Sequence, residues 1–452
     1  MRRDFTGHNV VVIGAGATGL ALTRYFCSRG ATVTLSDSRS AERIGDLGQL
    51  RELGVRLDLG GHTPELFLAA DLVAVSPGVP LTVPAVEAAR QAGVRVLGEI
   101  EIAFGELTAP LAAITGTNGK STTTTLMGEM FSAWGKRTFV GGNLGTPLIE
   151  AVDGEWDWLV AEISSFQLEA IYDFRPRYAL LLNITEDHLD RYPDMASYVA
   201  AKIQVFANMG EADVAVLNAE DPLVMAAAAD VRPRRILFSS RRLLPEGMGM
   251  DGEEIVWRFA GAERRFPPAQ LRLKGLHNVE NVMAALIPPL LEGCPPDVAW
   301  SAACRFAGLA HRMVLVRLLD GVTWYNDSKG TNVGSVVKSL AGLAAPVTLI
   351  AGGKDKGGDY APLAPLMREK VTHLILIGQA APRIAEALGH LTRTERADTL
   401  EAAVSRAREL TPPGGSVLLS PGCSSFDMFK SYEERGDIFT RAVLALPEKE
   451  AV

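Results

Sequence analysis

The feature that most constrains this chain is a recurring pattern: a short apolar run ends in a glycine or small polar turn, and a helical stretch follows. Five such runs are NVVVIGAGATG from residue 9, LAAITGTNGKS from 111, VTLIAGGKD from 347, HLILIGQAA from 373 and SVLLSPGCSS from 416. Continuous apolar strands that alternate with helices are typical of a parallel sheet covered on both faces. We therefore expect an α/β protein with mostly parallel sheets.

Three successive stretches of the chain carry this pattern, so we expect three α/β domains. At 452 residues the chain is long for one hydrophobic core, and a chain of this length holds about three domains. We place the domains at residues 1–98, 99–309 and 310–452. Residues 240–270 are polar and interrupted by glycine and proline, which indicates a hairpin or a loop excursion from the second sheet.

The first domain opens with a turn of the dinucleotide-binding type. An apolar strand over residues 10–13 leads into Gly14, Gly16 and Gly19, and a helix and a second strand that ends at Asp37 follow. This glycine spacing, with an acidic residue about 20 positions further on, indicates a Rossmann-like βαβ unit. The turn alone leaves its ligand open between NAD, another nucleotide and none. Any ligand would lie at the carboxyl ends of the strands.

The second domain contains a loop of the phosphate-binding type, TGTNGKS at residues 115–121. Ile114 stands where the pattern G-x-x-x-x-G-K-[ST] has its first glycine. Backbone N–H groups of such a loop converge on an anion, and the following helix adds the positive end of its dipole. Lys120 would then reach the outer phosphates, and the Ser121 hydroxyl would bind Mg²⁺. The alternative is an ordinary strand–turn–helix connection with a surface lysine.

Polar side chains that follow the apolar runs are candidates for catalysis, and each has a structural alternative. Glu162 directly follows a run and would bind Mg²⁺ or cap the next helix. His188, within TEDHLD, would be a second metal ligand or an ordinary loop histidine. Lys202 lies in a stretch of helical spacing, where a solvated lysine is the simpler interpretation. Asn278 and Asp327 would be a helix cap and a turn residue, or ligand contacts.

The overall composition argues against several classes of protein. A net charge of −8 and scattered basic residues do not fit a nucleic-acid-binding face. The four cysteines are widely spaced without a C-x-x-C pair, so neither a disulfide framework nor a zinc site is indicated. No apolar stretch approaches membrane-spanning length, and the first residues, MRRDFTGHN, lack the apolar core of a signal peptide. We therefore expect a cytoplasmic protein.

Nine motifs taken together resemble the successive signatures of the bacterial Mur ligases. They occur in order over nearly the whole chain: GTNGKST, GGNLGTP, AEISSFQLE, NITEDHLDRY, LKGLHNVENVMAA, LAHRM, NDSKGTN, AGGKDKGG and SPGCSSFDMFKSYEERG. The phosphate loop without its first glycine is also the form of this family. The motifs NDSKGTN and SPGCSSFDMFKSYEERG are most similar to those of the family members that add D-glutamate.

The resemblance implies a three-domain architecture and an ATP-dependent ligase activity. The implied domains are an N-terminal Rossmann-like domain for the UDP part of the substrate, a central ATP-binding domain with a mostly parallel sheet, and a C-terminal Rossmann-like domain for the amino acid. The implied reaction adds D-glutamate to UDP-N-acetylmuramoyl-L-alanine through an acyl phosphate, in cytoplasmic peptidoglycan precursor synthesis. ATP, two Mg²⁺ ions and a carbamoylated Lys202 would take part, and a monomer without nucleic-acid or membrane partners is expected.

The resemblance also implies roles for individual residues of this sequence. The catalytic group would comprise Lys120, Glu162, His188 and Lys202, and Mg²⁺ would be bound by Ser121, Glu162, His188 and the carbamate on Lys202. ATP would be bound by Gly116, Thr117, Asn118, Gly119, Lys120, Ser121, Thr122, Asn278, Arg312 and Asp327. The UDP-linked substrate would contact Ala17, Thr18, Asp37, Ser38, Arg39, Gly78, Asn143, Ser164, Gln167 and His188. D-Glutamate would contact Lys329, Thr331, Lys356, Ser425 and Tyr432.

Three alternative functions remain open from the sequence. Another Mur ligase, such as the L-alanine-adding enzyme, would differ in the amino acid that stimulates ADP release. Folylpolyglutamate synthase shares the central and C-terminal domains, but the N-terminal Rossmann-like unit argues against it. A non-catalytic UDP-sugar sensor or an NAD-binding module is a different class, and the density of phosphate and metal candidates argues against both.

Overall fold

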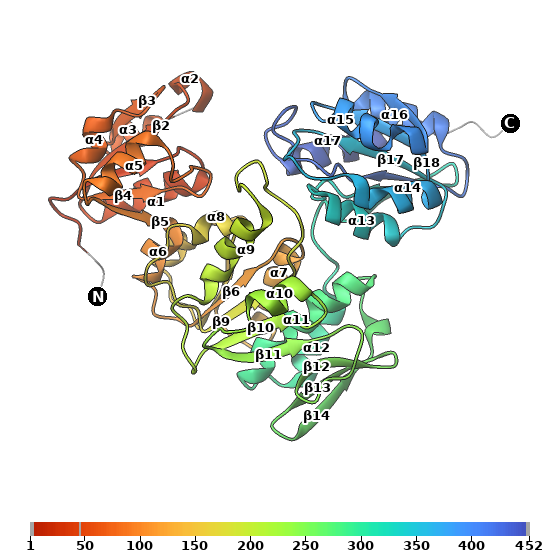
Figure 1. Ribbon diagram of the computed structural model, residues 1–452, viewed down its shortest axis with the longest axis horizontal. Helices are drawn as coiled ribbons and strands as arrows, with labels where there is room; N and C mark the ends of the chain where they lie inside the picture. Colours follow the sequence, from red (N-terminus) through yellow and green to blue (C-terminus); the bar gives the residue numbers. More distant parts are fainter. Residues whose placement is uncertain (1–3, 45–46, 449–452) are drawn as a thin grey trace. The chain divides into compact units, whose positions relative to one another are not determined.

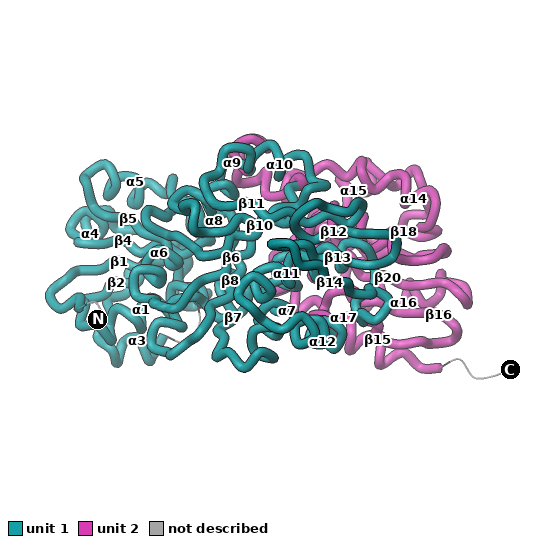
Figure 2. The backbone as a smooth tube through the Cα atoms, turned by 90° about the horizontal axis from the view of Figure 1, so that it is seen from below, with its two compact units in different colours: residues 1–184, 199–306 teal, residues 185–198, 307–452 magenta. Residues whose placement is uncertain are grey.

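A computed structural model describes residues 4–44 and 47–448, and these fall into two compact units. The first unit comprises the described residues up to Ile184 together with Val199–Phe306, and the second comprises Thr185–Tyr198 together with the described residues from Ala307 onward (Figure 2). The segment Thr185–Tyr198, which contains the motif TEDHLDRY, therefore groups with the C-terminal part of the chain. Our domain boundaries at residues 98 and 309 stay a prediction.

The N-terminal part of the first unit is a five-stranded sheet in the order β3-β2-β1-β4-β5 (Figure 1). All four strand pairings are parallel. The strands are β1 (Asn9–Ile13), β2 (Thr32–Asp37), β3 (Arg56–Leu59), β4 (Leu72–Val75) and β5 (Arg95–Gly98). The helices are α1 (Ala17–Ser28), α2 (Ala41–Ile44), α3 (Gly48–Glu52), α4 (Pro64–Leu68) and α5 (Pro84–Gln91), and α6 (Glu99–Phe104) leads into the central sheet. The order reverses at β1, so the turns after β1 and β4 meet where such sheets bind ligands.

The central sheet has nine strands in the order β14-β13-β12-β11-β10-β9-β6-β8-β7. Its strands are β6 (Leu111–Thr115), β7 (Thr138–Gly142), β8 (Trp158–Glu162), β9 (Tyr178–Leu181), β10 (Val214–Asn218), β11 (Arg234–Phe238), β12 (Gly247–Asp251), β13 (Glu254–Phe259) and β14 (Ala262–Phe266). Its helices are α7 (Lys120–Ala133), α8 (Ser165–Leu168), α9 (Met195–Ile203), α10 (Pro222–Ala227), α11 (Leu276–Leu291) and α12 (Pro296–Arg305), with 3₁₀ turns η1 (Leu148–Ala151), η2 (Gln204–Phe206) and η3 (Pro268–Gln270). β6 lies between β8 and β9 and pairs parallel with both, so the phosphate loop leaves the middle of the sheet.

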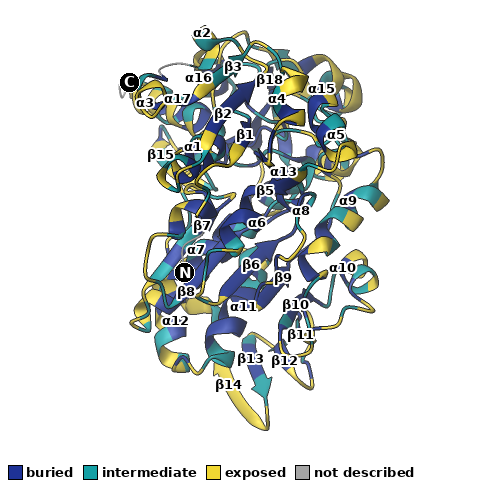
Figure 3. Cartoon of the chain, turned by 90° about the vertical axis from the view of Figure 1, so that its left-hand side faces the viewer, coloured by how far each residue is buried: buried dark blue, intermediate teal, exposed yellow. Residues whose placement is uncertain are grey.

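The far edge of the central sheet is antiparallel. β12, β13 and β14 form two consecutive hairpins over residues 247–266, as expected for the stretch 240–270. β14 is exposed except at Phe266, whereas β6 and β8 are buried throughout (Figure 3). The parallel part of the sheet, which carries the candidate site, is thus the covered part.

The second unit contains a six-stranded sheet in the order β15-β16-β20-β17-β18-β19. Its strands are β15 (Val314–Leu319), β16 (Val322–Asn326), β17 (Val347–Gly352), β18 (Val371–Ile377), β19 (Arg393–Arg396) and β20 (Ser416–Leu419). Its helices are α13 (Val333–Ala341), α14 (Ala364–Lys370), α15 (Ala381–Leu388), α16 (Leu400–Leu410) and α17 (Tyr432–Leu444), with 3₁₀ turns η4 (Ala361–Leu363) and η5 (Gly389–Leu391). Only the β15–β16 pairing is antiparallel among these described strands. Two apolar clusters, one with Leu349 and one with Ile350, cover the two faces of this sheet, because successive strand residues point to opposite sides.

Candidate active site

The glycine turn of the N-terminal sheet is closely packed. Gly19, near the start of α1, lies so near the carbonyl of Gly14 that an added Cβ would be 1.7 Å from that oxygen. Only glycine fits there, which is the role expected for the last glycine of the fingerprint. Of the expected substrate contacts, Ala17 and Thr18 are the first residues of α1, and Gly78 lies in the turn after β4.

Asp37, at the end of β2, fixes the rim of this turn. Its Oδ2 accepts a hydrogen bond of 2.7 Å from the backbone N–H of Ala15. Arg39 donates to the same carboxylate from its backbone N–H and from its guanidinium, over distances of 2.8 to 2.9 Å. Burial raises the pKa of Asp37, but these donors lower it more strongly, to about 2. Asp37 and Arg39 thus form one ionised pair beside the glycine turn, with Ser38 between them.

In the central sheet, Asn183 holds the phosphate loop in shape. The backbone N–H of Thr117 donates to the Asn183 carbonyl at 2.9 Å, and that of Asn118 donates to the Asn183 side-chain oxygen at 2.8 Å. The Asn183 amide in turn donates to the carbonyl of Asn118 at 2.9 Å. We did not predict Asn183, although its position just beyond the apolar run of β9 is the signal used for other residues.

Three expected site residues meet at the end of this loop. The Ser121 hydroxyl, in the first turn of α7, donates to Oε2 of Glu162 at 2.6 Å. The Asn143 amide donates to Oε1 of the same carboxylate at 2.7 Å. Glu162 is buried at the end of β8, and the helix that follows is capped by Ser164 instead. The helix-capping alternative for Glu162 is therefore wrong.

Two lysines converge on the carbonyl of Gly116 inside the loop. The Nζ of Lys120 donates to this oxygen at 3.0 Å and to the carbonyl of Thr117 at 2.8 Å. The Nζ of Lys202, on α9, donates to the Gly116 carbonyl at 2.9 Å. Lys202 is only 2% exposed, so the interpretation as a solvated lysine is wrong. A buried ammonium requires such compensation, and both amines lie where an anion would bind.

A capping box stabilises the turn that follows Glu162. The Ser164 hydroxyl accepts from the backbone N–H of Gln167, and the Gln167 side-chain oxygen accepts from the Ser164 N–H at 2.9 Å. Reciprocal bonds of this kind fix the start of a helix. Both residues were expected to contact the substrate, and they lie next to the Glu162 carboxylate in the sequence.

Helix α11 approaches the phosphate loop through Asn281. Its Oδ1 would lie 2.2 Å from a Cβ added to Gly119, whose φ of 89° already favours glycine. The Asn281 amide also donates to Oδ1 of Asn278 at 3.4 Å. Asn278 lies inside α11, which begins after Gly275, so the helix-cap alternative for Asn278 is wrong. Asn281 was not among the predicted residues; its three-residue spacing from Asn278 on one helix face could have indicated it.

In the second unit, Asp187 organises a cavity of about 290 Å³. Its Oδ1 lies 3.1 Å from the Nζ of Lys356, and its Oδ2 accepts from the Asn332 amide at 3.1 Å. His188 and Thr331 also line the cavity. His188 has a φ of 58°, an uncommon backbone conformation for a residue other than glycine. Its role as a metal ligand stays a prediction.

Asp327, directly after β16, is fully buried. Its Oδ2 accepts from the hydroxyls of Ser339 and Ser420 at 2.7 and 2.8 Å, and Nη1 of Arg312 lies 4.0 Å from its Oδ1. Burial raises the pKa of Asp327, although Arg312 and the two hydroxyls act in the opposite direction. The expected contacts of Arg312 and Asp327 with ATP stay predictions.

The remaining candidates lie around α17. The Nζ of Lys329 donates to the Tyr432 hydroxyl at 2.6 Å and lies over its ring. Ser425 is buried in the loop before α17. Arg435, which we did not predict, is fully buried and donates to the carbonyls of Ser328 and Cys423, so it joins the loops that carry Lys329 and Ser425. Burial lowers the pKa of Arg435 to about 10.

The first unit thus brings together five predicted site residues at the phosphate loop: Lys120, Ser121, Asn143, Glu162 and Lys202. In the second unit, Lys356 and Thr331 line one cavity. Lys329 and Tyr432 form a separate contact. Among the described residues, no group of three or more His, Cys, Asp or Glu is placed to hold a metal ion. No helix in the described ranges is long and apolar enough to cross a membrane. An α/β fold with a lysine-lined phosphate loop and an adjacent carboxylate defines a class of nucleotide-dependent enzymes.

Comparison with known protein families narrows this class. Residues 8–98 match the model of the MurD-like N-terminal domain of Mur ligases, residues 114–288 the Mur ligase middle domain, and residues 311–423 the Mur ligase glutamate ligase domain. The chain belongs to the Mur ligase family. The three-domain α/β architecture expected from the sequence is therefore confirmed.

Two relatives that are similar over nearly the whole chain have the same name. The chain is 67% identical over 444 residues to the UDP-N-acetylmuramoylalanine--D-glutamate ligase of Syntrophotalea carbinolica, an alignment that covers 98% of this chain and 99% of the relative. It is 54% identical to the ligase of the same name from Geotalea uraniireducens, over 98% of this chain and 99% of the relative.

Solved structures of other family members share the fold. UDP-N-acetylmuramate-alanine ligase MurC from Thermotoga maritima matches with a TM-score of 0.61 at 18% identity, over 97% of this chain and 99% of that chain. MurF from Acinetobacter baumannii matches with a TM-score of 0.61 at 17% identity, over 91% of this chain and 93% of that chain.

Proposed function

We propose that this protein is an ATP-dependent ligase that adds D-glutamate to UDP-N-acetylmuramoyl-L-alanine in the synthesis of peptidoglycan precursors. The observation that carries the proposal is the cluster at the phosphate loop, where Lys120 and Lys202 meet one carbonyl and Ser121 meets the Glu162 carboxylate. The names of the full-length relatives support the choice of substrates.

Amide ligation requires that a poor electrophile be activated. In the proposed reaction the γ-phosphoryl group of ATP is transferred to the substrate carboxylate, which gives an acyl phosphate and ADP. The amino group of D-glutamate then attacks the acyl carbon, loses a proton and expels phosphate. The Lys120 ammonium, on the inner side of the loop, would neutralise charge on the transferring group. The acyl phosphate hydrolyses readily, so water must be excluded before it forms.

The residues at the loop fit magnesium. Mg²⁺ favours hydroxyl and carboxylate oxygens and usually keeps phosphate oxygens among its ligands, and Ser121 with Glu162 supplies that donor set. When bound, magnesium would neutralise phosphate charge. We propose two ions, with His188 and a carbamate on Lys202 as further ligands. Carbamate forms when the neutral amine adds CO₂ and releases a proton, and burial of Lys202 favours the neutral amine.

We assign the UDP-linked substrate to the glycine turn of the N-terminal sheet and D-glutamate to the cavity of the second unit. The turn at Asp37 and Arg39 offers an anionic acceptor and a cation, which suit the uracil N–H and the diphosphate of a uridine nucleotide. Lys356 and Thr331, in the cavity lined by Asp187, would hold the carboxylates of D-glutamate, with Lys329, Ser425 and Tyr432 on the adjoining loops. We further propose that the enzyme acts in the cytoplasm as a monomer.

The test is to measure ADP release with ATP, Mg²⁺ and UDP-N-acetylmuramoyl-L-alanine while amino acids are supplied one at a time. D-Glutamate should stimulate release strongly. L-Glutamate and D-alanine should be very poor substrates, because a polar site leaves buried groups unpaired with the wrong ligand. Stronger stimulation by L-alanine or meso-diaminopimelate would assign the chain to another family activity, and a lack of turnover with any amino acid would exclude a ligase.

A further inference from the structure

Two glutamates at the start of α6 are both buried but are bonded differently. The carboxylate of Glu101 accepts three hydrogen bonds, from the backbone N–H groups of Tyr172, Asp173 and Phe174, at 2.9 to 3.0 Å. The carboxyl of Glu99 accepts one short hydrogen bond, at 2.7 Å, from the backbone N–H of Ile149 in η1, while the Gln167 side chain and the Leu148 N–H interact with it more weakly. Its Oε2 is buried and has no hydrogen-bond partner in the described chain.

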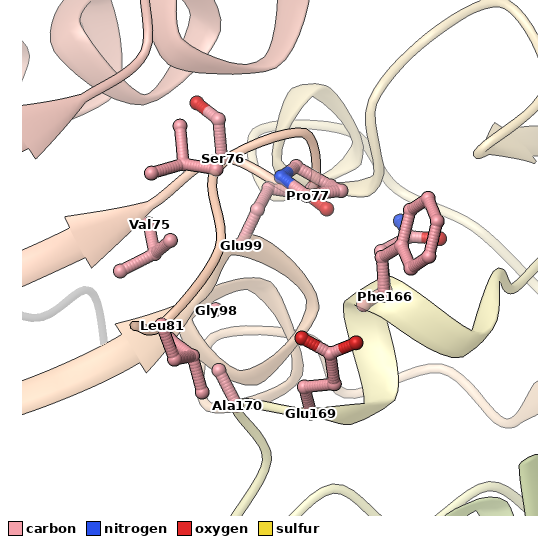
Figure 4. A pocket seen from close by; sticks show the side chains of 11 residues that line it. Val75, Ser76, Pro77, Leu81, Gly98, Glu99, Phe166, Glu169 and Ala170 are labelled. Carbon is pink, nitrogen blue, oxygen red and sulfur yellow. The ribbon is translucent and has the colours of Figure 1, made fainter. Parts of the chain in front are cut away.

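The Glu99 carboxyl lines a small cavity at the carboxyl ends of β4 and β5 (Figure 4). The cavity has room for about one water molecule, about 10 Å³. Ser76 and Pro77 border it on one side, and Phe166 borders it on the other. Gln167 also lines the cavity. The expected substrate contact Gly78 follows Pro77 directly, and Gln167 is itself an expected substrate contact. Glu99 thus lies close to Gln167, one of the residues proposed to contact the UDP-linked substrate, and shares its cavity with Pro77, the residue before Gly78.

Among the described residues that line the cavity beside Glu99, one other is titratable, and it is acidic. That residue is Glu169, whereas Glu101 lies two positions away on α6, about half a turn, so its side chain points to another side of the helix. Glu150 on η1 is paired with Arg24 at 2.7 Å at the surface. Burial raises the pKa of Glu99 to about 7, although the Ile149 N–H and the Gln167 side chain act in the opposite direction. An ionised Glu99 would therefore add a negative charge to a cavity that Glu169 also lines.

We propose that Glu99 is a positioning residue for the UDP-linked substrate, and that its carboxyl takes up a proton when this anionic substrate binds. This inference rests on the proposed function. The neutral carboxyl, as a donor, can hydrogen-bond across the cavity toward the Ser164–Gln167 turn, and it does not repel a diphosphate. The ionised form leaves a buried oxygen without a donor and raises electrostatic repulsion, so it weakens binding.

Calorimetry of substrate binding tests this directly. The wild-type protein is titrated with UDP-N-acetylmuramoyl-L-alanine at pH 6 and pH 8 in buffers of different ionisation enthalpy, which reports the number of protons taken up. At pH 8 the wild type should take up a substantial fraction of a proton more than Glu99→Gln, since glutamine cannot ionise. At pH 6 the wild type and Glu99→Gln should take up nearly the same number of protons. The KM for this substrate should rise between pH 6 and pH 8.5 on the order of tenfold in the wild type and less in Glu99→Gln.

Glu101→Gln is the matched control, because it changes a buried glutamate of the same helix that is already fully hydrogen-bonded. It should lower thermal stability yet keep the wild-type proton uptake. Glu99→Asp, which can still ionise, should retain pH-dependent uptake and serves if Glu99→Gln does not fold. Equal uptake by wild type and Glu99→Gln at pH 8 would overturn the inference. Binding without ligase turnover would instead contradict the proposed function, so the two failures are distinguishable.

Discussion

The two glycine turns of the first unit share a backbone design but differ in the charges that surround them. Each follows an inner strand that pairs parallel with both of its neighbours, β1 or β6, and each leads into a helix. At the N-terminal turn the Asp37 carboxylate accepts the backbone N–H of Ala15, so one anion-binding donor is already used. At the central turn two lysines reach the Gly116 carbonyl and a buried carboxylate meets Ser121.

This difference in charge suits the N-terminal turn to substrate binding and the central turn to phosphoryl transfer. A turn with an acceptor at its rim suits a ligand that offers N–H or O–H donors, whereas a turn with ammonium groups suits phosphates that gain charge during transfer. The glycine pattern therefore sets the backbone geometry, and the side chains from neighbouring elements decide what happens there. Substitutions at the central turn should mainly lower kcat, and those at the N-terminal turn should mainly raise KM.

Lys202→Ala should abolish most activity, with a loss in kcat of about 10³ or more. The change removes the proposed carbamate and one of the two lysine donors to the Gly116 carbonyl. A small carboxylic acid such as formate, added at high concentration, should restore part of the rate. Steady-state kinetics with and without formate is the measurement, and Lys136→Ala, a lysine stacked on Trp134, is the control. Wild-type kinetics for Lys202→Ala would exclude a role for this lysine in the reaction.

Lys120→Ala should lower kcat by about 10² to 10³, because one charge contact to the transferring phosphoryl group is lost. The fold should persist, since Asn183 holds the loop through backbone groups of Thr117 and Asn118. The circular dichroism spectrum of Lys120→Ala should therefore match that of the wild type, whereas its rate of ADP release should be low. A folded Lys120→Ala protein with near-normal turnover would refute the phosphate-loop assignment.

The sequence predicted the parts of this fold that have a strong local signal. The strand–glycine–helix units at β1 and β6, the apolar runs of β17, β18 and β20, and the hairpins after residue 240 were expected and are observed. The edge strand β15 was not expected, although its sequence VLVRLL is apolar except at Arg317; it pairs only with β16, and most of its residues are not buried. Strands at sheet edges depend on a partner that lies elsewhere in the chain.

The site was predictable where a side chain acts directly and less so where it supports another. Lys120, Ser121 and Glu162 follow from strand ends and loop chemistry. Asn183, Asn281 and Arg435 shape the loops through tertiary contacts. A strand end and a helix spacing could have indicated Asn183 and Asn281 as candidates, but neither signal shows which loop they hold, and Arg435 had no such signal. The burial of Lys202 was also beyond a periodicity argument, since helical spacing does not show which face of α9 is covered.

Asp37→Asn should raise the KM for the UDP-linked substrate about 10- to 100-fold and leave kcat within about threefold, because a hydrogen bond to a charged group contributes about 1.5 to 3 kcal/mol. The KM for ATP should not change. Initial rates with each substrate varied in turn measure both constants. A fall in kcat as large as that for Lys120→Ala would contradict the separation of binding from chemistry between the two turns.

The smallest of these effects concerns acid stability at the N-terminal turn. The pKa of Asp37 is depressed to about 2 in the folded protein from an ordinary value of 3.8. A depressed pKa contributes stability that is present above the unfolded value and is lost as the pH falls through the folded value. Between pH 5 and pH 2 the wild type should therefore lose more of its unfolding free energy than Asp37→Asn, by about 2 kcal/mol at most. Urea unfolding at pH 5, 4, 3 and 2 measures the difference, with Glu65→Gln, an exposed acid of the same domain, as the control. If the unfolding free energies of the wild type and Asp37→Asn fell equally with pH, Arg39 and the Ala15 N–H would not stabilise the ionised Asp37 carboxylate. The proposed difference in charge between the N-terminal turn and the central turn would then be wrong.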